Sequence, residues 1–591
     1  MKTKTKSRKS KAKSKSPKAD ELKPSVVPLN STLIESVSTN VLGETFSAQE
    51  IRDAFLDFAR HKSLSKCFDN AADAVSIALA DRDGVEQFCA TFSNEGESAR
   101  ENQIEVGEAN WDKLFAVMST LIVTYDLQRF LNKQDGEQIA TLFKDIETWT
   151  TIKSDLLNSD PVVFILAAVE LPFVIAAGLP SIPRTKRVVK NALTNLELAV
   201  EQLFDESGWL HCDWRSDLGV IIASMTRVRI LANEASAKLS QVLKNRLEWI
   251  GLQYARMLDS ELQPMLGASW ISEPRKILKG LRKVTEDESE KRLFKHIKRP
   301  SKKPPGEKDL PASADFGEEA MLGSLRCNWS ANSPRIGIAA DKSSGIQVEI
   351  GAHAPLISGL LQPTLEIDNA ETDLFNGEFE LNCWHSDKDI HYVELERKIP
   401  SGHWQRQFAL CRPDNLLLVA DAFLFDEEHD SVHYELGLPL ASDVETLQET
   451  ETRETYLKTG NQFIGLVLPL SLGEWKSDRT KHELMVQADS ATFAMTRRGR
   501  TLYNLFAIDL DMHRCTSPRT WRKLNVAERL ENVGDDVAVA YRFQIGKQQW
   551  VVYRNLTAVG NRTFMGKNVH CDFYVGRINS EHLIEQIIEI E

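Results

Sequence analysis

The stretch that decides the fold is Ile390–Pro439, which reads IHYVELERKIPSGHWQRQFALCRPDNLLLVADAFLFDEEHDSVHYELGLP. Apolar and polar residues alternate along it, the alternation breaks at turn residues such as those of Arg412–Asn415, and it then resumes. Successive side chains of a strand point to opposite faces of a sheet. The alternation therefore predicts successive antiparallel strands joined by short turns.

The same pattern continues through the C-terminal half of the chain, beginning near Met321. Short runs of β-branched, aromatic and aliphatic residues follow one another there, separated by turn residues. The predicted strands are Ile336–Ala339, Gly345–Ile350, Leu365–Ile367, Phe379–His385, Ile390–Arg397, Trp404–Cys411, Leu416–Phe423, Val432–Leu438, Gln462–Leu468, Glu483–Ala488, Thr501–Ile508, Val537–Ile545, Gln548–Tyr553 and His570–Val575. So many strands without helices between them predict a large antiparallel β-sandwich over residues 319–591.

Three further segments of this half carry specific expectations. The acidic segment Asp426–His433 is expected to form a solvated turn, and the charge run Asp443–Glu454 an exposed loop. The closing segment Glu581–Ile590 fits either a short amphipathic helix or a strand.

The preceding region, residues 44–295, has the pattern of helices. Apolar residues recur there at i, i+3 and i+4, which is the spacing of one helix face. The predicted helices include a first one opened by the capping box Ser47–Glu50, others around Ala71–Leu79, Trp111–Ile122 and Ile139–Ile146, a buried one in Pro161–Pro180 that Pro172 breaks, and those over Val188–Leu203, Leu218–Leu231 and Leu239–Leu258. This set predicts an all-α domain, an array of α-hairpins that curves into a partial toroid.

Two basic segments lie outside these domains. Residues 1–43 are rich in Lys, Ser, Thr and Pro and poor in aromatic residues, which predicts a disordered tail. Residues 296–318 cluster Pro and Lys and predict a linker between the two domains.

Charge is distributed unevenly along the chain. The formal net charge is −13, yet residues 1–18 hold nine Lys and Arg and no Asp or Glu, which leaves −22 for the remainder. Such a tail binds nucleic acid or another polyanion by electrostatic attraction. The alternative is a solubilising tail without a specific partner.

The N-terminus contains no hydrophobic segment of the kind that directs secretion, and the sequence contains no run of about 18 apolar residues. We therefore expect no membrane span and a cytoplasmic location. The eight cysteines are scattered without a CxxC pair, which favours reduced thiols over a zinc ribbon. Phosphate loops, nucleophile elbows and HExxH helices are also absent from the sequence.

A helical domain followed by a β-sandwich is the order of domains in several polysaccharide lyases. Within the sandwich half, four stretches resemble the C-terminal domain of the heparinase II/III-like family, as found in its bacterial members. They are Leu325–Trp329 (LRCNW), Gly345–Asn369, Trp404–Phe408 (WQRQF) and Leu416–Ala422 (LLLVADA). The resemblance covers about 320–580, and the helical part only by its order and size.

This resemblance implies that the partner is an acidic polysaccharide and that the reaction is β-elimination. The chain departs from the family at one place. Active members usually present a His-rich segment early in the sandwich, whereas the comparable stretch here is Ile346–Ile350 (IQVEI), followed by His353 alone. No catalytic histidine or metal ligand is therefore carried over to it.

In the helical half, the segment Trp209–Asp217 (WLHCDWRSD) is the strongest polar cluster, and it lies between two predicted helices. We expect His211 to be the base, because an imidazole side chain is able to exchange a proton near neutral pH, with Asp213 holding it in one tautomer. Arg215 would pair through its fork with a uronate carboxylate. That pairing acidifies the C5 proton, which the base removes, and a Tyr or His protonates the leaving oxygen. Tyr125 and Tyr254 are the candidate acids by residue type, with Tyr254 the one we select.

Two indoles in the same segment, Trp209 and Trp214, offer flat apolar faces that suit sugar rings, so both are candidate substrate-binding residues together with Asp213. The competing interpretation is structural. In it, Asp213 or Ser216 caps the following helix, and the tryptophans anchor a loop between helices.

In the sandwich half, Cys383–His391 (CWHSDKDIH) carries N, O and S donors at every second position. His385 and His391 would approach each other across a hairpin and would suit zinc, although an ordinary polar hairpin tip explains the same residues. We expect no other cofactor. A further set of candidate substrate-binding residues on a sugar-facing strand edge is His403, Trp404 and Arg406.

The leading hypothesis is a heparinase II/III-like protein that acts on, or binds, an acidic polysaccharide. The opposing hypothesis is a non-catalytic carbohydrate-binding or scaffold protein, and a third makes the basic tail a tether to nucleic acid. The lyase hypothesis requires His211, Arg215 and a tyrosine to converge on one cleft that faces the sandwich.

Overall fold

The computed structural model describes residues 155–591, except for 160, 171, 174–175, 177–184, 236, 267–273, 300–306, 342–344, 376 and 479–481. The basic tail (1–43), the capping box Ser47–Glu50 and the helices predicted before residue 155 lie outside the described residues. All described residues belong to one compact unit of the chain.

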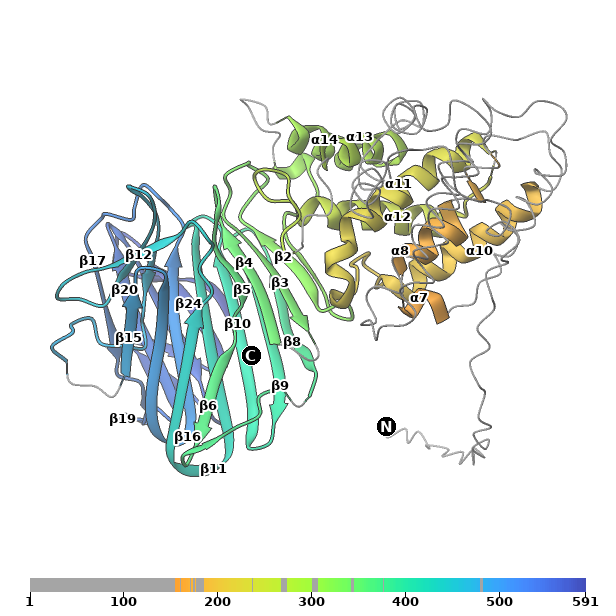
Figure 1. Cartoon of the computed structure of the whole chain (residues 1–591). Helices are drawn as coiled ribbons and strands as arrows, with labels where there is room; N and C mark the ends of the chain where they lie inside the picture. The colour runs from red at the N-terminus through yellow and green to blue at the C-terminus, as the bar shows by residue number, and fades with distance from the viewer. Residues whose placement is uncertain are drawn as a thin grey trace, which may run out of the picture. The chain divides into compact units, whose positions relative to one another are not determined.

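The N-terminal part of the described chain is helical (Figure 1). Its elements are α7 Asp155–Ser159, α8 Pro161–Phe164, the π-helix η2 Ile165–Glu170, α10 Thr185–Leu203, the 3-10 helix η3 Cys212–Asp217, α11 Leu218–Glu234, α12 Gln241–Arg256, α13 Pro274–Val284, α14 Glu288–Lys298 and the 3-10 helix η4 Glu307–Asp309. Helices α10, α11 and α12 confirm three of the predicted helices. Closure into a partial toroid stays a prediction, because the helices predicted before residue 155 lie outside the described residues.

The apolar segment that begins at Pro161 contains a fully buried carboxylate. Glu170, at the end of η2, is 0% exposed. Arg227 of α11 donates to its Oε2 at 2.8 Å, and the Ser224 hydroxyl donates to the same oxygen at 2.6 Å. Because a buried charge is costly unless it is paired and hydrogen-bonded, this pairing explains how an acidic residue lies inside a core helix.

The remainder of the described chain forms four antiparallel sheets (Figure 1). The first has the order β1-β2-β3-β4-β5, with β1 Asp315–Gly317, β2 Leu322–Arg326, β3 Arg335–Asp341, β4 Gly345–Gly351 and β5 Pro355–Leu360. The second sheet is the largest and has the order β12-β13-β14-β16-β11-β10-β9-β8. In addition, β15 pairs with β16, β6 pairs with β11 and β7 pairs with β6. Its strands are β6 Pro363–Ile367, β7 Ala370–Glu371, β8 Phe379–Ser386, β9 Ile390–Ile399, β10 Gly402–Cys411, β11 Leu416–Leu438, β12 Glu445–Gln448, β13 Thr455–Thr459, β14 Gln462–Leu468, β15 His482–Gln487 and β16 Ser490–Asp509.

Two smaller sheets complete the C-terminal part. One has the order β17-β20-β21-β24-β25, with β17 Arg519–Leu524, β20 Ala538–Ile545, β21 Gln548–Asn555, β24 Phe573–Ile578 and β25 Ile584–Ile590. The other has the order β19-β18-β22-β23, with β18 Ala527–Glu528, β19 Glu531–Asn532, β22 Arg562–Phe564 and β23 Lys567–Val569. The segment that ends at Ile590 is therefore a strand, not a helix. Because α14 ends at Lys298 and β1 begins at Asp315, the first strand lies inside the segment predicted as a linker.

The central strand β11 is buried on both faces. Leu416, Leu418 and Ala420 belong to a core shared with β20, β21 and β24. Leu417 and Val419 belong to a second core, shared with the helices and the first sheet. A strand covered on both faces needs apolar residues on both, which is why this part of the chain reads LLLVADAF without strict alternation. The largest sheet thus packs against further layers on each side.

The predicted turn at Asp426–His433 is wrong. Strand β11 continues through this acidic segment, which is marked only by register shifts between Leu424 and His429 and between His429 and Val432. Bulges of this kind absorb extra residues without ending a strand. Acidic residues thus mark an exposed part of a strand here, not its end.

The exposed loop predicted at Asp443–Glu454 is also wrong in part. The segment contains β12, which pairs with β13. At its end Glu454 is only 5% exposed and lies 3.3 Å from the guanidinium Nε of Arg519. The ion pair with an arginine distant in sequence explains the burial of this carboxylate. The number of charged residues in the local segment does not predict such a partner.

Candidate functional site

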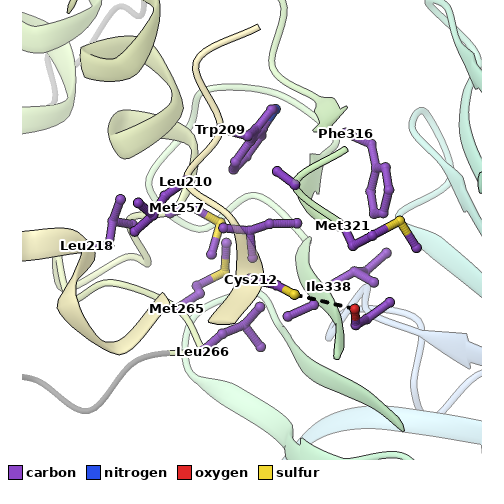
Figure 2. Close-up of a cluster of buried hydrophobic side chains, with 14 of the residues drawn as sticks. Trp209, Leu210, Cys212, Leu218, Met257, Met265, Leu266, Phe316, Met321 and Ile338 are labelled. Carbon is purple, nitrogen blue, oxygen red and sulfur yellow. Dashed lines mark hydrogen bonds between the residues drawn. The ribbon is translucent and has the colours of Figure 1, made fainter. Parts of the chain in front are cut away.

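The candidate site is the turn between α10 and α11, where the chain passes beside the first sheet. The backbone N–H of His211 donates to the Leu203 carbonyl, and that of Cys212 donates to the Ala320 carbonyl. The Cys212 thiol lies 3.4 Å from the carbonyl oxygen of Ala340 in β3, as Figure 2 shows. Burial raises the pKa of this thiol to about 12, so Cys212 is a structural anchor and not a nucleophile.

The guanidinium of Arg215 spans from this turn to strands β3 and β4. Its Nε donates to Oε1 of Gln347 at 2.8 Å, and its Nη1 donates to the Cys212 carbonyl at 2.8 Å. The same Nη1 lies 3.6 Å from Oδ2 of Asp341, and both side chains are partly exposed, at 22% and 18%. Among the described residues none accepts a hydrogen bond from Nη2. The structure therefore holds Arg215 in a fixed orientation with one terminal amino group available.

Three other predicted residues share the surface of this turn. His211 and Trp214 are half-buried, and Asp213 is exposed. Trp214 packs against the hydrophobic core along part of its ring. His211, Asp213, Trp214 and Arg215 are thus all at least partly exposed along one short stretch of chain beside the first sheet.

The structure does not show the helix-capping role expected for Asp213 or Ser216. The N-cap of α11 is Asp217, and no side-chain hydrogen bond caps that helix start. Asp213 and Ser216 therefore do not cap α11, which leaves the Asp213 carboxylate exposed to solvent.

The indole of Trp209 is not exposed at the site. Its side chain is 1% exposed and packs with Leu210, Met257 and Phe316 in the cluster of Figure 2. Its Nε1 donates to Oδ2 of Asp315 at 3.2 Å. This burial argues against a sugar-binding role for Trp209, because its flat face is covered by protein.

The predicted acid, Tyr254, is also buried. It lies in α12, is 0% exposed, and its hydroxyl has no hydrogen-bond partner among the described residues. Burial raises its pKa well above the usual value for tyrosine. Because no solvent-borne substrate reaches this hydroxyl, the placement contradicts the acid role predicted for Tyr254. The required convergence of a histidine, an arginine and this tyrosine is not seen.

Two of the three candidates on β10 lie inside the sandwich. Trp404 and Arg406 are each 0% exposed. Arg406 donates to both carboxylate oxygens of Asp421 at 2.7 Å, and the Trp404 Nε1 donates to Oδ1 of the same residue at 2.8 Å. These two residues therefore stabilise the core and do not form a sugar-facing edge. His403 is half-exposed and lies 3.0 Å from the Glu396 carboxylate.

The predicted zinc ligands are engaged separately. The Nε2 of His391 lies 3.1 Å from the Arg326 carbonyl, and its Nδ1 lies 2.9 Å from the Ser386 hydroxyl. A carbonyl only accepts, so Nε2 carries the proton and Nδ1 accepts from Ser386. Burial is the main cause that lowers the pKa of His391 to about 3.

The second predicted zinc ligand, His385, pairs with Asp387 at 3.3 Å. Within the described part of the chain, no three His, Cys, Asp or Glu side chains lie close enough together to hold a metal ion. With both nitrogens of His391 in hydrogen bonds, the arrangement argues against zinc at this hairpin.

The sequence interpretation missed the partners that orient the site. Asp341 and Gln347 belong to adjacent strands and meet Arg215 from more than 120 residues away in sequence. Gln347 and Glu349 are the two half-exposed residues of the otherwise buried β4, so the outward position of Gln347 was open to prediction from the alternation. Its contact with Arg215 depends on tertiary packing.

Comparisons with known proteins bear on the fold. Heparan sulfate lyase HepC from Pedobacter heparinus is similar with a TM-score of 0.58 at 12% identity, over 88% of this chain and 92% of that chain. A heparinase III structure gives 0.58 at 11% identity, over 89% and 95%. The heparinase III-BT4657 gene product gives 0.58 at 11% identity, over 88% and 94%.

No protein-family model matches the chain, and no curated protein is similar to it in sequence. In the described residues, no helix has the length and apolar character needed to cross a membrane. Because identities near 12% show shared architecture alone, the likeness establishes fold and not activity. The chain thus shares the overall fold of these heparan sulfate lyase and heparinase III structures.

Proposed function

We propose that this chain is a heparinase II/III-like protein that takes an acidic polysaccharide, with β-elimination at a uronate as its reaction. The observation that carries the proposal is the fold shared with heparan sulfate lyase HepC and heparinase III over most of each chain. Because Tyr254 does not join His211 and Arg215, the three-residue site expected from the sequence fails, and the chemistry proposed at the surface turn beside β3 and β4 uses His211 and Arg215 without a tyrosine.

The positioned fork of Arg215 supports recognition of a carboxylate. Gln347, Asp341 and the Cys212 carbonyl hold the guanidinium from one side. A uronate carboxylate would bind Nη2 from the solvent side, and charge-assisted bonds of this kind are among the stronger ones. Binding would withdraw electrons from the C5–H bond and acidify its proton.

With Tyr254 buried, one group must move the proton in both directions. His211 would remove the C5 proton, the C4–C5 double bond would form, and the C4–O bond to the leaving sugar would break. The same imidazolium would then return its proton to the leaving oxygen. Asp213, two residues further along the turn, would stabilise the charged form of the ring.

The first test measures product formation by the ultraviolet absorbance of the unsaturated uronate. Wild type, His211→Ala and a control, His513→Ala, are compared over a panel of glycosaminoglycans and alginates. His513 is exposed and lies between β16 and β17. We expect His211→Ala to lower kcat/KM by about 10³-fold, the range for loss of a general base, and His513→Ala to leave it unchanged. Product from wild type and His211→Ala at equal rates would contradict the proposed site.

A non-catalytic carbohydrate-binding protein is the second candidate function. Two observations favour it, the burial of Tyr254 and the pairing of Arg215 with Asp341. In this case wild type would bind an acidic polysaccharide without releasing any unsaturated product. Arg215→Lys would then raise the Kd about tenfold, because an ammonium keeps the charge but loses the Nη2 group that Gln347 and the Cys212 carbonyl orient, whereas the exposed Arg522→Lys would not. Absence of both binding and product would refute both candidate functions.

A further inference from the structure

Helices α13 and α14 present a dense group of basic side chains. In α13 the residues Pro274, Ile277, Leu278 and Leu281 are buried. Arg275, Lys279 and Arg282 are exposed, and their spacing of four and three residues places them on one helix face. At the end of α14, Lys298 and Arg299 follow the buried Leu293 and Phe294. We call Arg275, Lys279, Arg282, Lys298 and Arg299 the basic patch.

The two helices bring these charges close together. Helices α13 and α14 are consecutive and pack against each other (Figure 1). The pKa of Lys298 is lowered by partial burial and then by the positive charges of Lys279, Arg299, Arg282 and Arg275. Like charges from both helices therefore act on one another at this surface.

The nearby carboxylates do not neutralise the basic patch. Glu286 pairs with Lys244 at 3.0 Å, and Glu288 pairs with Lys291 at 2.6 Å. In the described portion of the protein, no ion pair joins any of the five patch residues to a carboxylate. Clustered cations that lack counter-charges raise the local potential, and a polyanion relieves it while releasing its own counterions.

We propose that the basic patch is a second contact surface for the acidic polysaccharide, separate from the turn that holds His211 and Arg215. The inference rests on the proposed function. With a rise of 1.5 Å per residue, Arg275 to Arg282 spreads cations along about 10 Å of helix. An extended chain with repeated anionic groups matches such a row better than a single small anion.

Polysaccharide fits this surface better than single-stranded nucleic acid. Proteins that bind single strands stack the bases on exposed aromatic rings. The one Phe, Tyr or Trp of the two helices is Phe294, which is 1% exposed. The patch thus offers charge without a stacking platform, which suits a ligand recognised through sulfate and carboxylate groups.

The experiment compares two triple variants of the full chain that remove the same charge. Arg275→Ala/Lys279→Ala/Arg282→Ala alters the patch, and Lys186→Ala/Arg187→Ala/Lys190→Ala removes three exposed basic residues from α10. Alanine favours helix at every one of these positions, and far-UV circular dichroism checks folding. Binding of heparin and of single-stranded DNA is measured over a range of salt concentrations. Both variants keep the basic N-terminal tail, so its contribution cancels.

We expect the patch variant to raise the Kd for heparin about tenfold or more at low salt and to lower the slope of log Kd against log salt by about 2 to 3. The α10 variant should change the Kd less than about twofold. Equal losses in both variants, or a loss for DNA without one for heparin, would overturn the inference while leaving the proposed function intact. If wild type binds no acidic polysaccharide, both the proposed function and this inference fail. If the alanine variant does not fold, the corresponding glutamine triple replaces it with the same expectations.

Discussion

Replacing Asp421 with Asn tests the structural role of Trp404 and Arg406 in the core. Asp421 is 2% exposed and accepts two hydrogen bonds from Arg406, one from Trp404 and one from the Tyr434 hydroxyl, at 2.6 to 2.8 Å. The amide keeps the size of the side chain but removes the negative charge. A fully buried guanidinium is then left without a counter-charge.

The magnitude follows from the cost of an uncompensated buried charge. Each charge-assisted hydrogen bond contributes about 1.5 to 3 kcal/mol, and breaking a buried ion pair by removing one partner costs about 3 to 5 kcal/mol. Because Asn still accepts some of the four hydrogen bonds, we expect Asp421→Asn to lower the free energy of unfolding by about 3 kcal/mol. Replacing both members of the pair, Arg406→Met with Asp421→Leu, should cost less than the sum of the two single changes.

The assay is urea denaturation followed by far-UV circular dichroism, with Asp426→Asn as the control. Asp426 lies in the same strand and is exposed, so its replacement should change stability by less than about 0.5 kcal/mol. If Asp421→Asn is as stable as wild type but loses affinity for polysaccharide, the buried-pair argument is refuted and a sugar-binding role for this strand returns.

Three further changes probe burial elsewhere. Burial raises the pKa of Glu290 from 4.5 to about 7; since the folded state then binds the proton more tightly, this group's contribution to stability is lost as pH rises from about 4.5 to about 7. Glu290→Gln should therefore be about 3 kcal/mol more stable than wild type at pH 8 and equal to it at pH 4. Glu288→Gln serves as an exposed control. A pH dependence of stability that is the same in Glu290→Gln as in wild type would contradict this prediction. Burial lowers the pKa of His391 from 6.5 to about 3. Wild type therefore loses stability as pH falls below 6.5, by about 2 kcal/mol at pH 5. Thermal melts of His391→Gln should show a smaller loss of stability between pH 6.5 and pH 5, and an equal loss would show that the histidine is not the cause. Gly317→Ala should destabilise the protein by about 2 kcal/mol in urea, because the added Cβ would lie 2.8 Å from the Cβ of Trp209; wild-type stability would mean that the two segments separate freely.

The candidate site was only partly predictable, and the reason lies in burial. The residues His211, Asp213 and Arg215 stand in a polar segment between helices, and the structure places them at the surface as that segment indicates. Tyr254 and Trp404 were chosen by residue type alone, and both proved to be core residues. An aromatic ring with a polar atom is equally suited to a binding surface and to a core with one hydrogen-bond partner.

The sequence by itself determined that helices precede strands in the described part, because side-chain periodicity is a property of neighbouring residues. The run Leu416–Ala420 has no polar side chain for an exposed face, which agrees with its burial on both faces in the structure. Only the tertiary structure decided what covers Trp209, which carboxylate holds Arg406, and that Asp341 and Gln347 meet Arg215. Contacts between residues far apart in the chain depend on how layers pack, and local pattern carries no information about that packing.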